Sequence, residues 1–291
     1  MLQAERRFTM KKLELKQFDL EQIADSGQCF RWTRIEDNNT DKKDQNIVKY
    51  KIVAFGKVLH IEQDIITGLV YMDSSDNDFE NIWKGYFDLD TDYGKIIDRI
   101  PEDDSYLKRA ASACDGIRII RQDPWETLIT FIISQRKNIP AIKASVEKIC
   151  KAAGHVIGED INGEVYAFPT AGELAALSEE TLQSCSLGYR APYVYKVSCA
   201  IADGAVDLDN WKSFSDEELF DNLCSLHGVG KKVANCTMLF GFYRLDSFPI
   251  DVWMNKIQDK YYPEGFPMEA YRPYGGVMQQ YMFAYERNIS S

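Results

Sequence analysis

Residues 215–236 read SDEELFDNLCSLHGVGKKVANC, a stretch that contains two helices and the turn between them. Ser215 and Glu218 have the spacing of a capping box, which starts a helix. A second helix is expected to begin at Lys231, directly after a glycine-containing turn. The stretch therefore predicts a helix-hairpin-helix, and the whole motif is placed at residues 215–242.

The turn of this hairpin reads Gly228-Val229-Gly230. Glycines let the backbone turn tightly and let a phosphate come close to exposed N–H groups. The start of the second helix adds a partial positive charge that is directed at the same anion. We therefore predict DNA phosphate contacts at Gly228 and Gly230. Taken alone, such a turn is more often only structural, so its function depends on the neighbouring residues.

Lys232 lies at the start of the second helix, and Asp251 precedes the next predicted helix in the run Phe248-Pro-Ile-Asp251. One helix and a proline-containing turn separate the two residues, a spacing that can bring them to one cleft. An amine beside a carboxylate suits attack on the anomeric carbon of a sugar, followed by a Schiff base. Taken alone, Lys232 is a solvated lysine and Asp251 an N-cap, so only the pair predicts chemistry.

Strand-forming residues dominate the part of the chain before residue 100. Residues 47–64 are rich in Val and Ile and predict two short strands around a turn at Gly56-Lys57. The polar residues 36–46 are expected to form a hairpin loop, and the acidic residues 73–80 another loop or a helix start. We therefore expect residues 12–100 to be largely β-structure.

From about residue 105 the apolar residues follow a helical period instead. Residues 125–135 predict a buried apolar helix, and residues 139–154 an amphipathic helix that ends at Gly154. The predicted fold class is α+β. A β-rich N-terminal domain at residues 10–104 precedes a larger all-helical domain at residues 105–291, which contains the helix-hairpin-helix.

The net charge of −11 is not typical of a protein that binds nucleic acid, because phosphate contacts need lysine and arginine. The charge is unevenly distributed, however. Residues 63–104 contain twelve acidic and three basic side chains, whereas residues 105–155 contain nine basic and four acidic ones. Distribution matters more than the sum, so we expect modest, salt-sensitive affinity for DNA on one face.

Seven cysteines, an odd number without close pairs, extend from Cys29 to Cys236 and indicate reduced thiols. The N-terminal residues have no apolar core of a secretory signal, and no apolar run is long enough to span a bilayer. A cytoplasmic monomer is expected, associated with the nucleoid if the source is a prokaryote. No cofactor is predicted, and three scattered histidines, His60, His155 and His227, predict no metal site.

Five segments, in order along residues ~12–287, give this chain a specific resemblance. The hairpin with Phe248-Pro-Ile-Asp251 resembles the helix-hairpin-helix/Gly-Pro-Asp superfamily of DNA glycosylases. The other four segments are similar to those of the 8-oxoguanine DNA glycosylases within it. These segments are Asp25–Trp32 (DSGQCFRW), Arg121–Pro124 (RQDP), Leu187–Arg190 (LGYR) and the C-terminal Gln279 with Phe283.

The resemblance implies a bifunctional enzyme of base-excision repair. It implies that Lys232 is the Schiff-base nucleophile and that Asp251 is its electrostatic and proton-handling partner. The target base must leave the duplex, because its reacting atom is inaccessible in the stack. Gly27 matches the residue whose carbonyl accepts the N7–H that 8-oxoguanine has and guanine lacks. Guanine would leave that buried acceptor unpaired, so the contact discriminates between the two bases.

The same resemblance implies five further contacts with DNA. Cys236 and Phe283 would sandwich the flipped base, and Gln279 would read its Watson–Crick edge. Tyr189 and Arg190 would fill the vacated space and contact the estranged base. Several of these residues also suit plain structural roles: Gly27 that of a turn glycine, Phe283 that of a core aromatic residue and Cys236 that of a small buried one.

The sequence departs from the family pattern at three positions. Arg136 replaces the asparagine that fills the gap in the duplex, and Ala141 replaces an arginine that reads the opposite cytosine. Trp253 stands where a histidine that contacts phosphate is expected. Because one of two cytosine-reading arginines is missing, we predict that selectivity for the base opposite the lesion is relaxed.

Rival functions are separated by a few residues. An alkylpurine glycosylase of the superfamily would lack the lysine at position 232, and an iron–sulfur enzyme would need four cysteines after the last helices. No cysteine follows Cys236. The predicted function is excision of 8-oxoguanine from double-stranded DNA, with β-elimination at the resulting abasic site. The alternatives are a non-catalytic helix-hairpin-helix module and a superfamily glycosylase for another damaged purine.

Overall fold

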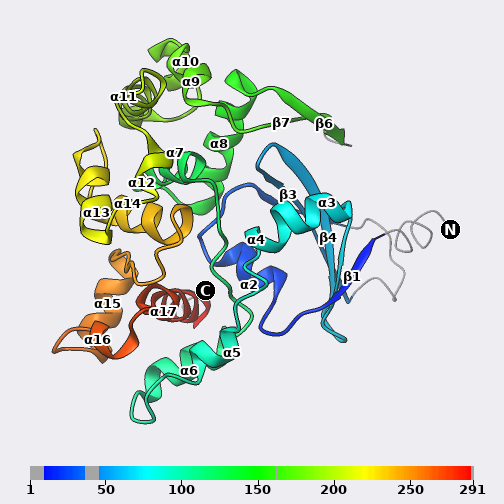
Figure 1. Ribbon diagram of the computed structural model, residues 1–291, viewed down its shortest axis with the longest axis vertical. Helices are drawn as coiled ribbons and strands as arrows, with labels where there is room; N and C mark the ends of the chain where they lie inside the picture. Colours follow the sequence, from blue (N-terminus) through cyan, green and yellow to red (C-terminus); the bar gives the residue numbers. More distant parts are fainter. Residues whose placement is uncertain (1–9, 37–45, 161–162, 290–291) are drawn as a thin grey trace. The chain divides into compact units, whose positions relative to one another are not determined.

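The computed structural model describes residues 10–36, 46–160 and 163–289 (Figure 1). Residues 37–45, which make up most of the predicted loop at 36–46, lie outside the described part of the chain. Among the described residues, no helix has both the length and the apolar character needed to cross a lipid bilayer.

The chain forms two compact units that are interleaved along the sequence. The first unit consists of residues 1–53, 58–120 and 256–291, and the second of residues 54–57 and 121–255. The domain boundary predicted near residue 105 is therefore displaced to residue 120, and the C-terminal segment belongs to the first unit. The physical reason is packing: helix α6 (Ser105–Ala113) packs against the C-terminal helix α17 (Gly275–Ile289).

The first unit contains a five-stranded antiparallel sheet in the order β1-β5-β4-β3-β2. The strands are β1 (Lys11–Glu14), β2 (Trp32–Arg34), β3 (Ile47–Ala54), β4 (Lys57–Asp64) and β5 (Leu69–Met72). The predicted strand pair is confirmed, and its turn is Phe55-Gly56, both with positive φ. Alternate residues of β4 are buried, as expected for a sheet with one face on the core.

Helices, most of them short, rather than further strands complete the first unit. They are α2 (Leu20–Asp25), α3 (Asp76–Asp78), the π-helical turn η1 (Phe79–Trp83), α4 (Lys84–Tyr86), α5 (Tyr93–Ile97), α6, α16 (Met268–Tyr271) and α17. The prediction that residues 12–100 are largely β-structure is wrong for α2, α4 and α5. Side-chain caps form these short helices: the Asp19 carboxylate accepts N–H groups of α2, and Asp92 caps α5.

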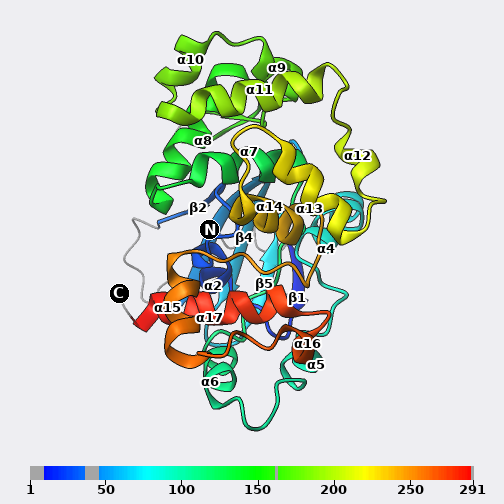
Figure 2. The same cartoon turned by 90° about the vertical axis from the view of Figure 1, so that its left-hand side faces the viewer.

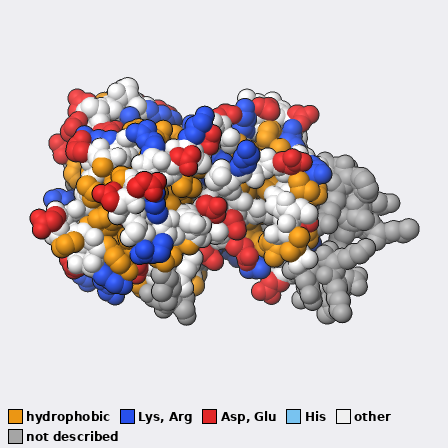
Figure 3. Space-filling view, turned by 90° about the horizontal axis from the view of Figure 1, so that it is seen from below, with side chains coloured by type: hydrophobic (Ala, Val, Ile, Leu, Met, Phe, Trp, Pro, Cys, Tyr) orange, Lys and Arg blue, Asp and Glu red, His pale blue; other side chains and the backbone are white. Residues whose placement is uncertain are grey.

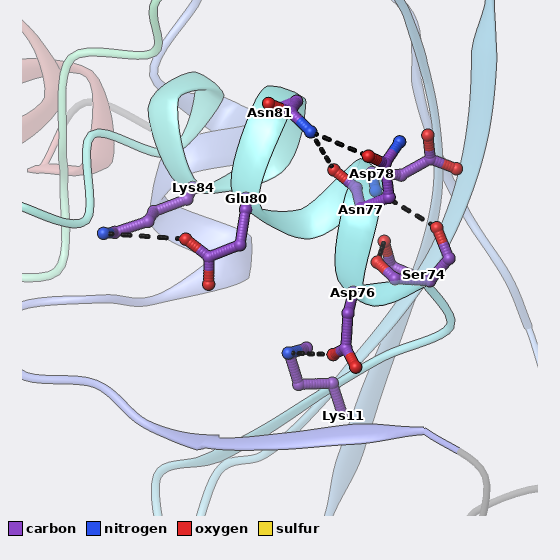
Figure 4. A network of polar contacts seen from close by, with 9 residues as sticks. Lys11, Ser74, Asp76, Asn77, Asp78, Glu80, Asn81 and Lys84 are labelled. Atoms are coloured by element: carbon purple, nitrogen blue, oxygen red, sulfur yellow. Dashed lines mark hydrogen bonds and ion pairs between the residues drawn. The ribbon is translucent and has the colours of Figure 1, made fainter.

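The acidic residues 73–80 form a helix start, one of the two predicted alternatives. The Ser75 hydroxyl accepts the N–H of Asp78 and caps α3. Figure 4 shows Lys11 of β1 directed at Asp76 of α3, with Nζ 2.6 Å from Oδ1. This exposed ion pair holds the pKa of Asp76 below its usual value through the hydrogen bond from Lys11. It joins the edge strand to the helical segment, although an exposed pair contributes little stability.

The second unit is mainly helical, as predicted. Its elements are α7 (Pro124–Ser134), α8 (Ile139–Ala153), β6 (Val156–Asp160), β7 (Gly163–Tyr166), α9 (Ala171–Ala175), α10 (Glu179–Ser184), the 3-10 turn η2 (Gly188–Arg190), α11 (Ala191–Ala202), α12 (Leu208–Trp211), α13 (Asp216–Ser225), α14 (Lys231–Cys236) and the π-helical turn η3 (Thr237–Gly241). Helix α15 (Val252–Tyr261) begins in this unit and ends in the first.

Helix α7 forms the core of the second unit. It packs against α8, α14 and η3, and seven consecutive residues from Thr127 to Ile133 are buried. The Phe131 and Phe240 rings stack 5.5 Å apart between α7 and η3. A helix that is apolar on all sides is buried on all sides, as the sequence predicted. Helix α7 is therefore the element against which the hairpin is positioned.

Candidate active site

Helices α13 and α14 form the predicted helix-hairpin-helix (Figure 2). The capping box is present, because the Ser215 hydroxyl accepts the Glu218 N–H and the Glu218 carboxylate accepts the Ser215 N–H. Gly228 has φ +80, a conformation that favours glycine. A Cβ on Gly228 would lie 2.3 Å from Cγ of Tyr193 on α11, so the ring also leaves no space for a side chain.

The second glycine of the turn has a different environment. Gly230 has φ −100, which any residue adopts, and a Cβ there would have no atom within 4 Å. Gly230 is the N-cap of α14, and no side chain caps this helix. The first N–H groups of α14 are therefore available to an anion, and the helix dipole favours a negative charge there. Gly228 is needed for the backbone conformation of the turn, whereas Gly230 leaves space beside the first N–H groups of α14.

Lys232, in the first turn of α14, is partly buried rather than solvated. Its Nζ lies 4.8 Å from the centre of the Phe131 ring, and Phe131 is only 2 % exposed. One turn further along α14, the thiol of Cys236 is almost fully buried. Burial raises the pKa of this thiol, and the charge and hydrogen bond of Lys232 oppose the rise. The amine is therefore held at a specific place by a ring and a thiol.

Asp251 caps α15, as predicted, but uses only one of its oxygens to do so. Oδ1 accepts the N–H groups of Trp253 and Met254, both at 2.9 Å. Among the described residues, no hydrogen bond occupies Oδ2. The carboxylate is close enough to Cys236 to raise the pKa of its thiol, as a smaller effect than burial. Lys232 and Asp251 therefore both act electrostatically on the same buried thiol.

A second cluster of predicted residues lies in the first unit. Gly27 has φ +77, and a Cβ on it would lie 3.4 Å from Cε1 of Phe283. Arg287, one turn after Phe283 on α17, donates from Nη1 to the carbonyl of Asp25 at 2.7 Å. Its guanidinium lies 5.4 Å from the centre of the Phe283 ring. The structure therefore brings the predicted discriminating glycine and the predicted stacking ring together.

Two buried glutamines support this second cluster. Gln28 is fully buried and donates from Nε2 to the Ser26 hydroxyl and the Arg118 carbonyl, while its Oε1 accepts the Ile120 N–H. These bonds hold the loop that contains Gly27. Gln279, 3 % exposed, accepts a 2.9 Å hydrogen bond from Nε2 of Gln280. Cys236 belongs to the other unit, so its predicted sandwich with Phe283 stays a prediction.

The residues predicted to face the opposite strand lie in the second unit and differ in exposure. Arg136 is exposed, and Tyr189 is 49 % exposed. Arg190 is only 6 % exposed, and its guanidinium donates to the carbonyls of Gln135 and Leu187. It also lies 4.3 Å from the centre of the Tyr189 ring. The Arg190 side chain thus connects η2 with the residue after α7. Its contact with the estranged base stays a prediction.

The surface seen in Figure 3 carries acidic and basic side chains interspersed with one another. The net charge of −11 therefore does not produce a uniformly acidic surface on this face. Local charge, rather than the sum, is what an approaching DNA backbone meets within a Debye length.

The chain is similar to known proteins in both sequence and fold. The 8-oxoguanine DNA glycosylase N-terminal domain family matches residues 11–128. The N-glycosylase/DNA lyase of Saccharomyces cerevisiae is 30 % identical over 261 residues, covering 84 % of this chain and 68 % of the yeast protein. The chain belongs to the 8-oxoguanine DNA glycosylase family. The solved 8-oxoguanine glycosylase/lyase of Clostridium acetobutylicum, bound to double-stranded DNA with cytosine opposite 8-oxoG, is 33 % identical with a TM-score of 0.85. That match covers 97 % of this chain and 98 % of the clostridial chain.

A solved structure of lower sequence identity is similar in fold. The 3-methyladenine DNA glycosylase of Archaeoglobus fulgidus has a TM-score of 0.68 over 97 % of this chain and 99 % of its own, at 16 % identity. Two residues of the candidate site, Phe131 and Gln28, were not predicted from the sequence. Phe131 is one of many apolar residues in its helix, and no sequence signal distinguishes it. Gln28 lies inside the DSGQCFRW segment that carries the family resemblance, and its place beside Gly27 could have indicated a structural role there.

The two hairpin glycines predict separable mutant effects. Gly228→Ala adds a methyl group at positive φ against the Tyr193 ring, so we expect a loss of about 2 kcal/mol of stability. Gly230→Ala meets no atom and should unfold like the wild type, but its methyl group obstructs a phosphate at the start of α14. Chemical denaturation and binding of double-stranded DNA measure the two effects. Equal stabilities of the two variants would contradict the different roles assigned to Gly228 and Gly230.

Proposed function

We propose that this chain excises 8-oxoguanine from double-stranded DNA by means of Lys232 and then cleaves the strand at the abasic site. The observation that carries the assignment of the nucleophile is the position of Lys232. A lysine that served only to start α14 would extend its ammonium into water. Here Nζ lies over the buried Phe131 ring and interacts with Cys236, a thiol whose pKa the charge of Asp251 also affects.

Each group then has a defined role in the reaction. The neutral Lys232 amine attacks C1′ of the everted nucleotide, and the bond from C1′ to the base breaks. Oδ2 of Asp251 stabilises the positive charge that develops at the sugar, and it accepts the proton that the attacking amine loses. The C1′–O4′ bond then breaks, O4′ takes up a proton, and the opened sugar carries a Schiff base between C1′ and the lysine nitrogen. This Schiff base makes the adjacent C2′ proton acidic, so β-elimination breaks the bond to the 3′ phosphate. No cofactor is required for these steps.

Gly27, Phe283 and Gln279 supply recognition of the lesion in this proposal. The Gly27 loop is held by buried hydrogen bonds of Gln28, and a rigid carbonyl is what discrimination by a single N7–H requires. The partner is duplex DNA that contains 8-oxoguanine, acted on by a monomer, and a reducing compartment such as the cytoplasm is compatible with seven free thiols.

Lys232→Gln should abolish covalent trapping of the protein on 8-oxoguanine duplex by borohydride, because no Schiff base forms without the amine. Binding of the same duplex should persist. Lys231→Gln is the matched control, since Lys231 is exposed and has the same charge; it should still be trapped. Trapping of the Lys232 variant at the wild-type level would exclude Lys232 as the nucleophile, and no trapping of the wild type would indicate a non-catalytic module.

Asp251→Asn tests whether the carboxylate acts beyond its role as a cap. Asparagine caps helices as well as aspartate does, so its Oδ1 should still accept the N–H groups of Trp253 and Met254. Thermal stability should therefore stay near that of the wild type, whereas single-turnover excision should slow by about 100-fold or more. A variant with reduced stability and an unchanged rate would show that Asp251 is only a cap.

Selectivity for the opposite base should be relaxed. Ala141 has no donor for cytosine, whereas the other predicted cytosine-reading arginine, Arg190, remains. A bidentate arginine contact is worth about 1–3 kcal/mol of discrimination, and this chain has one fewer. Excision rates opposite C, A, G and T should therefore agree within about tenfold. A strong preference for cytosine in single-turnover assays would refute the prediction.

A further inference from the structure

Arg136 has an unusual backbone conformation. Its φ of +54 is left-handed, a region that residues with a Cβ rarely adopt. The residue follows the end of α7, and its side chain is exposed with no hydrogen bond or ion pair among the described residues. Nothing that Arg136 itself contacts accounts for this conformation. The explanation must therefore come from its neighbours.

The residue before Arg136 is tied at both its backbone and its side chain. The Gln135 carbonyl accepts Nε of Arg190 at 2.8 Å and also its Nη2. The Gln135 side chain donates from Nε2 to the carbonyl of Gly228 at 3.0 Å. Gln135 therefore connects the end of α7 with η2 and with the turn of the hairpin.

The residue after Arg136 is tied in the same manner. Lys137 donates from Nζ to the Ser145 hydroxyl of α8 and to the Ser186 carbonyl, both at 2.6 Å. Lys148 donates to the Ser186 hydroxyl at 2.7 Å, so the loop before η2 is held by two lysines. Burial and the nearby Arg190 and Lys148 lower the pKa of Lys137, as expected for an ammonium turned inward. Lys137 is thus directed into the protein rather than toward an approaching DNA backbone.

We propose that Gln135 and Lys137 are positioning residues that hold Arg136 in a preformed wedge conformation before DNA binds. This inference rests on the proposed function, because a wedge is needed only when a base leaves the duplex. A side chain that fills the gap must be ordered on binding, and fixing its backbone in advance reduces that entropic cost. The tied segment also joins the wedge to η2 and to the hairpin, so the three elements approach DNA as one unit.

A different role for Lys137 makes a different prediction. If Lys137 merely contacted a phosphate as a cation, only the loss of its charge would matter. Ser145→Ala keeps every charge and removes one acceptor of the tie, from a side chain that is 1 % exposed. The positioning role therefore predicts that Lys137→Met and Ser145→Ala act in the same direction. The charge role predicts an effect of Lys137→Met alone.

The experiment compares single-turnover excision of 8-oxoguanine from two duplexes. In one the lesion is paired with cytosine, and in the other it faces a stable abasic analogue, so that no base pair must be opened. We expect Lys137→Met to slow excision of the paired lesion about tenfold, and Ser145→Ala to slow it about threefold. Each variant should slow excision of the unpaired lesion by less than about twofold. Lys196→Met, at an exposed lysine of α11, is the matched control and should excise both lesions at wild-type rates.

Thermal unfolding of each variant distinguishes misfolding of the protein from displacement of Arg136. A misfolded variant would excise the lesion more slowly from both duplexes, by the same factor. Wild-type rates of both variants on the paired lesion would overturn the proposal. So would a defect confined to Lys137→Met, or a defect of equal size on the two duplexes. A wild-type protein that excises neither lesion would overturn the proposed function itself, and this inference would fall with it.

Discussion

The contact between the Lys232 ammonium and the Phe131 ring is the interaction on which the candidate chemistry depends. Lysine ordinarily extends its charge into water, and the first turn of a helix does not attract a cation. Here the ring, 4.8 Å from Nζ, and the thiol of Cys236 hold the amine at a defined place. Because Phe131 lies on α7 and Lys232 on α14, the packing of these two helices decides where the proposed nucleophile lies.

Helix α7 therefore has two tasks in the second unit. Near its C-terminal end it places Phe131 under the amine, and directly after it Gln135 begins the segment that presents Arg136. At its N-terminal end, the Asp123 carboxylate accepts the Glu126 N–H, and burial raises the pKa of that carboxyl. A helix buried along its length and capped at its start moves little, so the amine and the wedge have one rigid support.

Features of the fold that depend on residues close together in sequence could be predicted from the sequence. The capping box at Ser215, the end of one hairpin helix and the start of the next all follow from residues a few positions apart, and the structure has them. The short helices within residues 12–100 were missed, because single caps rather than a long apolar period create them. The burial of Arg190 and the proximity of Gly27 to Phe283 depend on segments far apart in sequence, which no pattern of spacing encodes. The domain division was misplaced for the same reason, since α6 packs on a helix at the opposite end of the chain.

The acidic segment 63–104 explains why the net charge is a poor guide to the partner of this protein. Many of its carboxylates accept N–H or O–H groups of the first unit: Asp64 from Ile66 and Thr67, Asp88 from Thr91 and Tyr93, Asp92 from Lys95, and Asp104 from Leu107, Tyr262 and Tyr271. These groups serve the fold, because turns and short helices need acceptors that a side chain supplies. The hairpin meets the opposite requirement with backbone N–H groups at the start of α14, which add no formal charge. The negative total and the proposed phosphate contacts thus belong to separate parts of the chain, and only the local arrangement bears on DNA.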